Sequence, residues 1–277
     1  MLFSIAEEHS SPAKNRTFFA SDSEHLFTER WGNTMYNQRS NGPFGGGNVF
    51  RSRYNYQSLP YGYENTQASA LISKVLGLLA FSFIFATIGA FFGLQITLSY
   101  GAYWLVAIAG FIVLIALHFL IQVSGLNLVL LYLFTFLEGL SLAPLLGAYL
   151  SFSGGQALLM QAFLITALTS LGLGVYSWTT KRDFSRLGDY LFFGLILLLV
   201  AGLIGIFFHS TLFVLIISVV GIAIFCGYVL FYVQRAKYMA DTTPNAIGLT
   251  VSIFITVLNL FLYILQLLTI LSGNRRN

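Results

Sequence analysis

From Leu71 to the end of the chain, long apolar blocks follow one another with very short polar gaps between them. Each block holds about 20 residues or more, which is the length an α-helix needs to cross the hydrocarbon core of a bilayer. We therefore predict seven transmembrane helices, at about 73–98, 103–122, 126–151, 157–178, 189–208, 212–232 and 246–271. The division between the second and third is the weakest, because the apolar run is interrupted there by four residues alone: Gln122, Ser124, Gly125 and Asn127.

The composition of the chain supports a membrane protein and excludes a soluble one. Hydrophobic residues make up 57% and charged residues 9% of the 277 residues, whereas a soluble domain carries about 25% charged residues to wet its surface. The net charge of +4 forms no concentrated phosphate-binding patch, since half of the basic residues lie before residue 75 among acids. We therefore expect an all-α integral membrane protein that contacts the lipid bilayer and has no nucleic-acid partner.

Residues 1–68 differ from the rest of the chain in composition. They are rich in Ser, Asn, Gly, Tyr and Arg, and they show no sustained apolar period. Such a segment buries too little apolar surface to offset the entropy of ordering it. We predict a disordered polar tail at 1–68, followed at 71–277 by a seven-helix membrane domain. Its aromatic residues leave two interpretations open: a plain tether, or contact with the membrane surface or a partner.

Basic residues indicate which side of the membrane each loop faces, because Lys and Arg concentrate in cytoplasmic loops. Twelve of the fourteen Lys and Arg lie in the N-terminal region, in the loop after the fourth helix or just after the sixth. Seven spans place all three regions on the same side. We therefore predict a cytoplasmic N-terminus and an external C-terminus, with Arg275 and Arg276 as the two exceptions.

Two ionisable residues fall inside the predicted spans, Glu138 in the third and His118 near the end of the second. A charged group at mid-bilayer costs about 2.5–3.5 kcal/mol on insertion scales, so each requires an explanation. Thr135 and Ser141 lie three residues on either side of Glu138, which makes one face of that helix polar. Two interpretations stay open for Glu138: a neutral, hydrogen-bonded structural carboxyl, or a proton-sensitive, cation-attracting group. His118 is expected to have no special role.

The seventh predicted helix carries one continuous polar stripe. Its members recur with a period near 3.5 residues: Ser252, Thr256, Asn259, Tyr263 and Gln266. Lipid cannot satisfy these groups, so the stripe must face other helices or water. It forms either interhelical hydrogen bonds or the lining of a pore or cavity. Both alternatives predict a central position for this helix.

Other features concern packing and chemistry. Gly89 and Gly93 form a GxxxG pattern in the first helix, which permits close contact with another helix. The sequence contains no Gly-rich phosphate loop with its Lys, no GxSxG and no HExxH motif, and Cys226 is its single cysteine. We therefore expect a protein that is not an enzyme, with no catalytic residues, no cofactor and no metal site.

Four segments resemble motifs of the Bax inhibitor-1 family, in the family's order and spacing. FLEGLSLAPLL at 136–146 is similar to its third-helix motif, and YSWTTKRDFSRLGDYLFFGL at 176–195 to the signature that joins helices four and five. CGYVLFYVQRA at 226–236 resembles its sixth helix, and LNLFLYILQLL at 258–268 resembles its last one.

This resemblance covers about residues 70–277 and places Lys181, Arg182 and Asp183 in the signature loop. It implies six helices around a central seventh, and a protein that protects against cell death or stress. Some family members behave as pH-sensitive calcium leaks, which use two facing aspartates near the cytoplasmic ends of the sixth and seventh helices. A bacterial branch instead binds and modulates a membrane AAA protease of the FtsH type.

The family's aspartate pair is absent from this chain. The resemblance aligns Tyr232 with the sixth-helix aspartate and Thr256 with the seventh-helix aspartate. Neither is negatively charged at neutral pH, since tyrosine titrates at about pH 10 and threonine does not titrate. The protease-modulating branch also has a small hydroxyl residue at the seventh-helix position, which favours that branch. Arg235 follows Tyr232 by three residues, at the expected cytoplasmic interface.

Two functions of different classes follow from these observations. The leading hypothesis is a regulatory protein of the bacterial inner membrane that acts by binding. It would modulate a membrane AAA protease in membrane-protein quality control or stress survival. The alternative is a cation leak, with calcium as the ion that the family implies. In that case Glu138, Thr256 and Asn259 line the path, and Tyr232 and Arg235 belong to the path or its gate.

Overall fold

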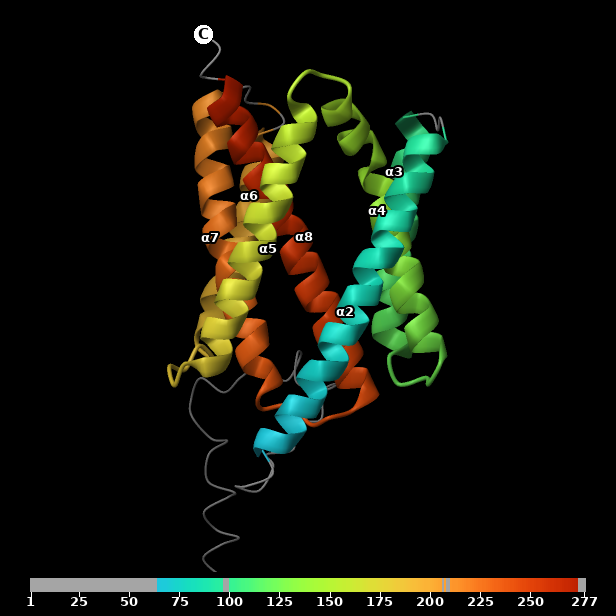
Figure 1. Ribbon diagram of the computed structural model, residues 1–277, viewed down its shortest axis with the longest axis vertical. Helices are drawn as coiled ribbons and strands as arrows, with labels where there is room; N and C mark the ends of the chain where they lie inside the picture. The colour runs from blue at the N-terminus through green and yellow to red at the C-terminus, as the bar shows by residue number, and fades with distance from the viewer. Residues whose placement is uncertain (1–63, 97–99, 206, 208–209, 274–277) are drawn as a thin grey trace, which may run out of the picture. The chain divides into compact units, whose positions relative to one another are not determined.

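The structure is a computed structural model, and it describes residues 64–96, 100–205, 207 and 210–273. The described residues form seven helices (Figure 1): α2 (Glu64–Gln95), α3 (Tyr100–Leu120), α4 (Leu126–Leu150), α5 (Gly155–Thr179), α6 (Leu187–Gly205), α7 (Thr211–Ala236) and α8 (Thr243–Gly273). Each helix is long and apolar enough to cross a membrane. The predicted all-helical fold with seven spans is therefore confirmed. The predicted tail at 1–68 lies outside the described residues, except that α2 begins within its last positions.

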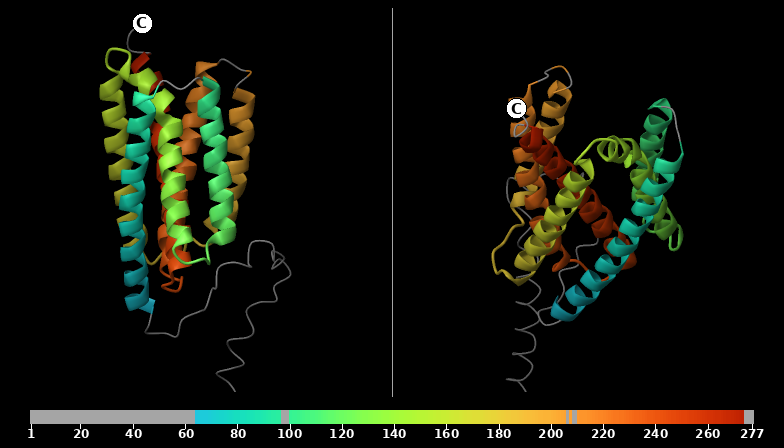
Figure 2. Two further views of the ribbon diagram at one scale, coloured as in Figure 1. Left: turned by 90° about the vertical axis from the view of Figure 1, so that its right-hand side faces the viewer. Right: turned by 45° about the horizontal axis from the view of Figure 1, so that its top comes forward.

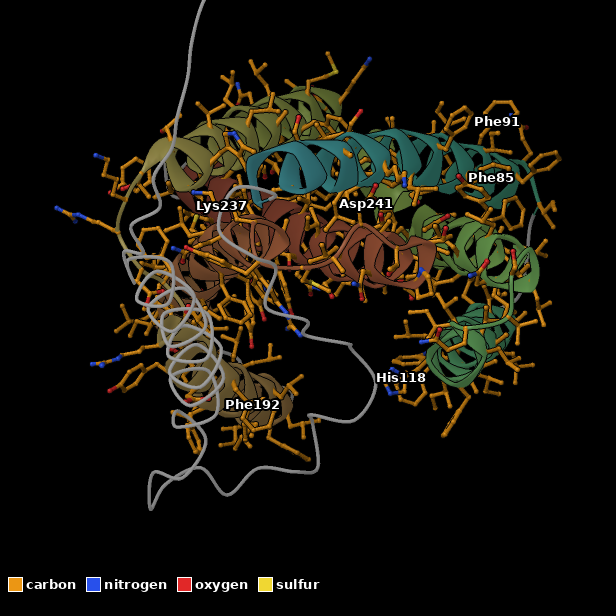
Figure 3. All side chains as sticks on the ribbon, turned by 90° about the horizontal axis from the view of Figure 1, so that it is seen from below. Phe85, Phe91, His118, Phe192, Lys237 and Asp241 are labelled. Atoms are coloured by element: carbon orange, nitrogen blue, oxygen red, sulfur yellow. The ribbon has the colours of Figure 1, made fainter. Side chains whose placement is uncertain are left out.

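The last helix, α8, is the central one, as its polar stripe predicted. It packs against α2, α4, α5 and α7, whereas α3 packs mainly on α4 and α6 mainly on α7. Figure 3 shows α8 running through the middle of the other helices. Thirteen residues of α8 are buried, compared with two of α6. The two outer helices are therefore connected to the centre mostly through α4 and α7.

Close backbone contact joins α2 to α4. A Cβ atom on Gly89 would lie 2.1 Å from the Phe136 carbonyl oxygen, and one on Gly139 would lie 1.9 Å from the Ala86 carbonyl oxygen. Gly93 also lies against α4, where a Cβ atom would be 2.4 Å from the nearest side chain. Any larger residue at these positions would push the two helices apart. The GxxxG pattern therefore provides the close helix contact predicted for it.

A tight turn separates α3 from α4, at the place where the apolar run is least interrupted. Gly125 has φ 82°, a left-handed value that glycine adopts without steric cost. The buried Asn127 side chain donates from Nδ2 to the Ile121 carbonyl at 3.0 Å, which satisfies a carbonyl left free at the end of α3. Gly125 and Asn127, which suggested a division in the sequence, are therefore the residues that form the turn.

Large apolar side chains cover the outer faces of the helices. Trp104 on α3, Phe163 on α5 and Phe193 on α6 are each 65% exposed. Such faces would be unfavourable in water, whereas lipid tails are as apolar as the side chains themselves. The outer faces therefore fit the bilayer that the chain spans.

Three loops lie at the end of the bundle where α2 begins, namely α3–α4, α5–α6 and α7–α8 (Figures 1 and 2). We call this end the basic end and define it by Lys74, residues 177–186 and residues 234–245, because it carries the basic residues of both longer loops. The C-terminal end of α8 lies opposite. This grouping is the one that the predicted orientation requires, and the side of the membrane that each end faces stays a prediction.

Candidate functional site at the basic end

The α5–α6 loop, residues 180–186, contains the three residues of the signature loop. Asp183 accepts two hydrogen bonds from Ser185, from its hydroxyl at 2.6 Å and from its backbone amide at 2.8 Å. These bonds hold the pKa of the exposed Asp183 carboxyl below its ordinary value of 3.8. Lys181 and Arg182 are exposed. The loop therefore presents its cations to the outside while its carboxylate is engaged within the loop.

Gln234, in the last turn of α7, fastens this loop to the bundle. Its side chain is 4% exposed, and its Nε2 donates to the Arg182 carbonyl at 2.6 Å. Its Oε1 accepts a hydrogen bond from the Phe184 amide. One buried amide group thus binds the loop backbone on both sides of Asp183. Because both halves of the amide are engaged, breaking either bond would leave a buried polar group without a partner.

Lys237, directly after α7, reaches across to the end of α5. Its Nζ donates to the Ser177 carbonyl at 2.7 Å and to the Thr180 carbonyl at 3.4 Å, and lies 5.6 Å from the centre of the Trp178 ring. A cation there satisfies carbonyls that have no partner within α5 and meets the negative end of the helix dipole. Burial lowers the pKa of the Lys237 ammonium. The Ser177 hydroxyl in turn donates to the Leu230 carbonyl at 2.7 Å, so α5 and α7 are joined in both directions.

An ion pair connects α2 to the α7–α8 loop. Lys74 Nζ lies 2.9 Å from both carboxylate oxygens of Asp241, with side chains that are 52% and 19% exposed. Exposed pairs of this kind contribute about 0–1 kcal/mol to stability. Asn245 closes the same loop by donating from Nδ2 to the Ala240 carbonyl at 2.9 Å. Side chains therefore join α2, α5, α7 and α8 at this end.

Tyr232 and Thr256, the two residues that the resemblance aligned with the family's aspartates, have separate partners. The Tyr232 ring stacks on the Tyr228 ring with centroids 5.5 Å apart. Thr256 is 3% exposed, and its hydroxyl donates to the Ser252 carbonyl of its own helix at 2.7 Å. Within the described residues no hydrogen bond joins Tyr232 to Thr256. These positions therefore hold an aromatic stack and an engaged hydroxyl, with no carboxylate for acid to neutralise.

Arg235 and His118 both lie near helix ends at the basic end. The Arg235 guanidinium is in the last turn of α7, 5.9 Å from the centre of the Phe231 ring, where the negative face of the ring attracts the cation. His118 is exposed near the end of α3 (Figure 3), with its ring centre 6.1 Å from that of Phe119. Arg235 and His118 therefore lie near one end of the bundle, whereas Glu138 lies in the middle of α4.

Glu138 is half-buried and lies against α3. Its Oε1 is 3.5 Å from the place that a Cβ atom on Gly110 would occupy. In the part of the chain that the structure describes, its carboxyl forms no hydrogen bond and no ion pair, with Arg235 or any other residue. Its backbone carbonyl accepts a hydrogen bond from the Ser141 hydroxyl at 2.8 Å. The hydrogen bonds expected of a structural carboxyl are thus not formed by the described residues.

The polar stripe of α8 is satisfied partly by its own helix and partly by α7. Three of its side chains donate to the carbonyl four residues earlier, at 2.7 to 2.9 Å: Ser252, Thr256 and Asn259. Gln266 instead accepts a hydrogen bond from Ser218 of α7 at 2.8 Å. The Tyr263 ring lies against Gly221 of α7, where a Cβ atom would be 2.8 Å away. The second half of the stripe therefore makes the interhelical contact that was one of its two predicted roles.

Several residues of this site were not assigned to it from the sequence: Lys74, Ser177, Gln234, Lys237 and Asp241. Two of them, Gln234 and Lys74, leave a signal in the sequence. Gln234 is an uncharged amide at the end of an otherwise apolar helix, within the segment CGYVLFYVQRA. Lys74 is a single positive charge at the start of an apolar block. Neither signal names the partner, because the partners lie far away along the chain.

Comparison with known families identifies the membrane domain. The family model described as Inhibitor of apoptosis-promoting Bax1 matches residues 68–273. The chain belongs to the Bax inhibitor-1 family. The match extends over nearly all of α2 to α8, so the resemblance found in four motifs at about 70–277 is confirmed. This is a family of multi-pass membrane proteins that is not known for enzymatic activity.

Relatives of this Bax inhibitor-1 family member occur in bacteria and in a virus. An uncharacterized protein of Campylobacter jejuni is 35% identical over 214 residues, which cover 74% of this chain and 92% of that protein. An uncharacterized membrane protein of Vibrio cholerae is 36% identical over 182 residues, or 64% of this chain and 81% of its own. The Golgi anti-apoptotic protein of vaccinia virus strain Lister is 31% identical over 210 residues, or 73% and 85% of the two chains.

Proposed function

We propose that this chain is a regulatory protein that acts by binding another membrane protein, and that its partner is a membrane AAA protease of the FtsH type. Family membership supports a regulatory role, and the similar proteins of Campylobacter jejuni and Vibrio cholerae support a bacterial inner membrane as its location. The name of the vaccinia relative, an anti-apoptotic protein, supports a role in survival under stress.

One observation favours the protease-binding branch over a calcium leak. Tyr232 is held in an aromatic stack, and the buried Thr256 hydroxyl is bonded to its own helix. A latch that opens when carboxylates are protonated requires carboxylates at these two positions. Without them, the α7–α8 contact is neutral and does not change over the physiological pH range. A bundle in which the α7–α8 contact does not respond to pH, and which carries charged loops at one end, is suited to binding another protein.

Copurification tests this proposal. The full chain carrying an affinity tag is expected to copurify with the membrane protease from its host, and its deletion is expected to change the turnover of the protease's membrane substrates. Tyr232→Phe is the matched control, because it keeps the ring stack and removes the phenolic hydroxyl alone. No association, together with unchanged substrate turnover after deletion, would contradict the proposal.

A second function, a cation leak, is favoured by one separate observation. The Glu138 carboxyl lies at mid-span without a hydrogen bond or ion pair among the described residues, and an intramembrane carboxyl of this kind is a default candidate for an ion path. Calcium flux into liposomes that contain the purified chain separates the two functions. For a binding protein we expect no flux above that of empty liposomes.

If flux is measured, its pH dependence identifies the responsible group. We expect a rate that is nearly flat between neutral and mildly acid pH, and Glu138→Gln is expected to abolish any remaining slope. The double variant Tyr232→Asp with Thr256→Asp restores the family's acids and is expected to introduce a pH response. A steep response of the unmodified chain that survives Glu138→Gln would show that another group controls the flux.

A further inference from the structure

We propose that the α5–α6 loop is a binding surface for the headgroups of anionic phospholipids in the leaflet at the basic end. The surface consists of Lys181, Arg182 and Arg186. All three are exposed, and none of them forms an ion pair with another described residue. This inference does not depend on whether the protein binds a protease or conducts ions.

The two described acids of this segment, Asp183 and Asp189, form no ion pair with these cations. Asp183 accepts both of its hydrogen bonds from Ser185. The charge of Arg186 favours the ionised form of the Asp183 carboxyl, but Arg186 does not reach ion-pair distance from it. Asp189 lies in the first turn of α6, where a carboxylate is stabilised by the positive end of the helix dipole. The three cations therefore keep their charge available for an external anion.

The covalent geometry of the loop determines what its cations can reach. Seven residues, 180–186, connect two helices that cross the membrane, and so short a segment cannot extend far from the bilayer surface. Tyr190, 75% exposed in the first turn of α6, and Tyr176, 43% exposed near the end of α5, flank the loop. Aromatic side chains of this kind are enriched at headgroup level. The phosphate layer is therefore the nearest source of negative charge.

The loop is also fixed before it binds. Gln234 holds its backbone at Arg182 and Phe184, and Lys237 holds the end of α5 from which it starts. Cations on a backbone that is already ordered lose less conformational freedom on binding than cations on a free loop. Each cation near an anionic surface strengthens attraction by about fivefold, so three of them distinguish an anionic headgroup from a zwitterionic one.

Quenching of tryptophan fluorescence by brominated lipids measures this selectivity. The chain contains Trp31, Trp104 and Trp178, and the double variant Trp31→Phe with Trp104→Phe leaves Trp178, beside the loop. The full chain is placed in bilayers of brominated phosphatidylglycerol or brominated phosphatidylcholine, and the ratio of the two binding constants is derived. The control variant keeps Trp104 alone, which lies near the start of α3 at the opposite end.

We expect a ratio of about fivefold or more for Trp178 and a ratio near one for Trp104. The triple variant Lys181→Gln, Arg182→Gln and Arg186→Gln is expected to bring the Trp178 ratio close to one. High salt added to the unmodified loop should lower the ratio as well, which tests the proposal even if the triple variant does not fold. Gln234→Leu keeps every charge and frees the loop, so the ratio is expected to fall by about twofold.

The proposal is overturned by a Trp178 ratio near one in the chain with an intact loop, or by a ratio that the triple variant leaves unchanged. A ratio near one combined with cross-linking of Lys181 to an acidic segment of a protein would assign the surface to a protein partner. That result would also overturn the assignment to lipid.

Discussion

The membrane interior and the basic end of this protein are held together by different interactions. In the interior, α2 and α4 meet backbone to backbone at Gly89 and Gly139, and the Thr256 hydroxyl is bonded to its own helix. At the basic end, Gln234 and Lys237 reach from α7 to the backbone of another segment. Lipid offers no hydrogen bonds, so Ser252, Thr256 and Asn259 bond within their own helix, the Ser218 hydroxyl bonds across to Gln266, and close packing joins the helices. Near water, a loop keeps one conformation only if a fixed group holds it.

The largest effect is expected from Gly139→Leu in the interior. Because a Cβ atom there would lie 1.9 Å from the Ala86 carbonyl oxygen, α2 and α4 must separate, and the free energy of unfolding is expected to fall by about 3 kcal/mol or more. Gly172→Leu is the matched control, since the space around a Cβ on Gly172 is open. Unfolding in denaturing detergent, followed by circular dichroism, measures both. Equal stability of the two variants would show that close packing does not hold the interior.

A smaller, local effect is expected from Gln234→Leu at the basic end. The variant leaves the Arg182 carbonyl and the Phe184 amide without their partner, which costs about 1–3 kcal/mol. The loop should open while the helices stay folded, so trypsin is expected to cleave after Lys181 and Arg182 much faster than in the unmodified chain. Gln156→Leu, at an exposed position at the other end of α5, should leave the cleavage rate unchanged. Equal cleavage rates of the two variants would show that Gln234 does not hold the α5–α6 loop.

Thr256→Val in the interior is expected to change stability by less than about 1 kcal/mol. The Thr256 hydroxyl bonds to the Ser252 carbonyl, which keeps its helical hydrogen bond in the variant, so no buried group loses its last partner. The same detergent unfolding measures the difference. A loss as large as that of Gln234→Leu would mean that the Thr256 hydroxyl joins helices, as the Ser218 hydroxyl does, and that the two regions are more alike than the contacts of Thr256 indicate.

The smallest effect concerns pH and Ser185→Ala in the loop. Hydrogen bonds from Ser185 depress the pKa of Asp183 below 3.8, so their stabilising contribution is present above that value and is lost as pH falls through the lowered pKa. Ser185→Ala is expected to raise the pKa of Asp183 towards 3.8, which a carboxyl NMR titration would detect. Near neutral pH the loop should show no pH dependence from this group. An unchanged pKa in the variant would show that the Ser185 hydroxyl does not stabilise the ionised form of Asp183.

Features that depend on neighbours along the chain were predictable from the sequence. The predicted third span at 126–151 agrees with α4 at Leu126–Leu150, because the length of an apolar run is a local property that the bilayer thickness imposes. The 3.5-residue period of the stripe placed α8 at the centre, because polar groups on one face of a span exclude that face from lipid. Gly89 predicted close packing without indicating that α4 would be the partner.

The candidate site was predictable only in part, for a physical reason. The signature loop with Lys181, Arg182 and Asp183 was found through resemblance, but the residue that fixes it, Gln234, lies 52 positions beyond Arg182. An amide at the end of a helix looks the same in the sequence whether it faces water or a loop. Gln234 can hold the backbone of the α5–α6 loop only because α5 and α7 lie side by side.

The sequence by itself thus determined the environment, the number of spans and the central helix, because each follows from the local composition or from the periodicity of an apolar block. Tertiary structure alone decided which backbone each polar side chain binds. Lys74 and Asp241 are 167 residues apart and form an ion pair, while Glu138, at mid-span, faces Gly110 of α3. Such pairs arise from helix packing, in which the free energy of close contact selects neighbours that no periodicity along the chain encodes.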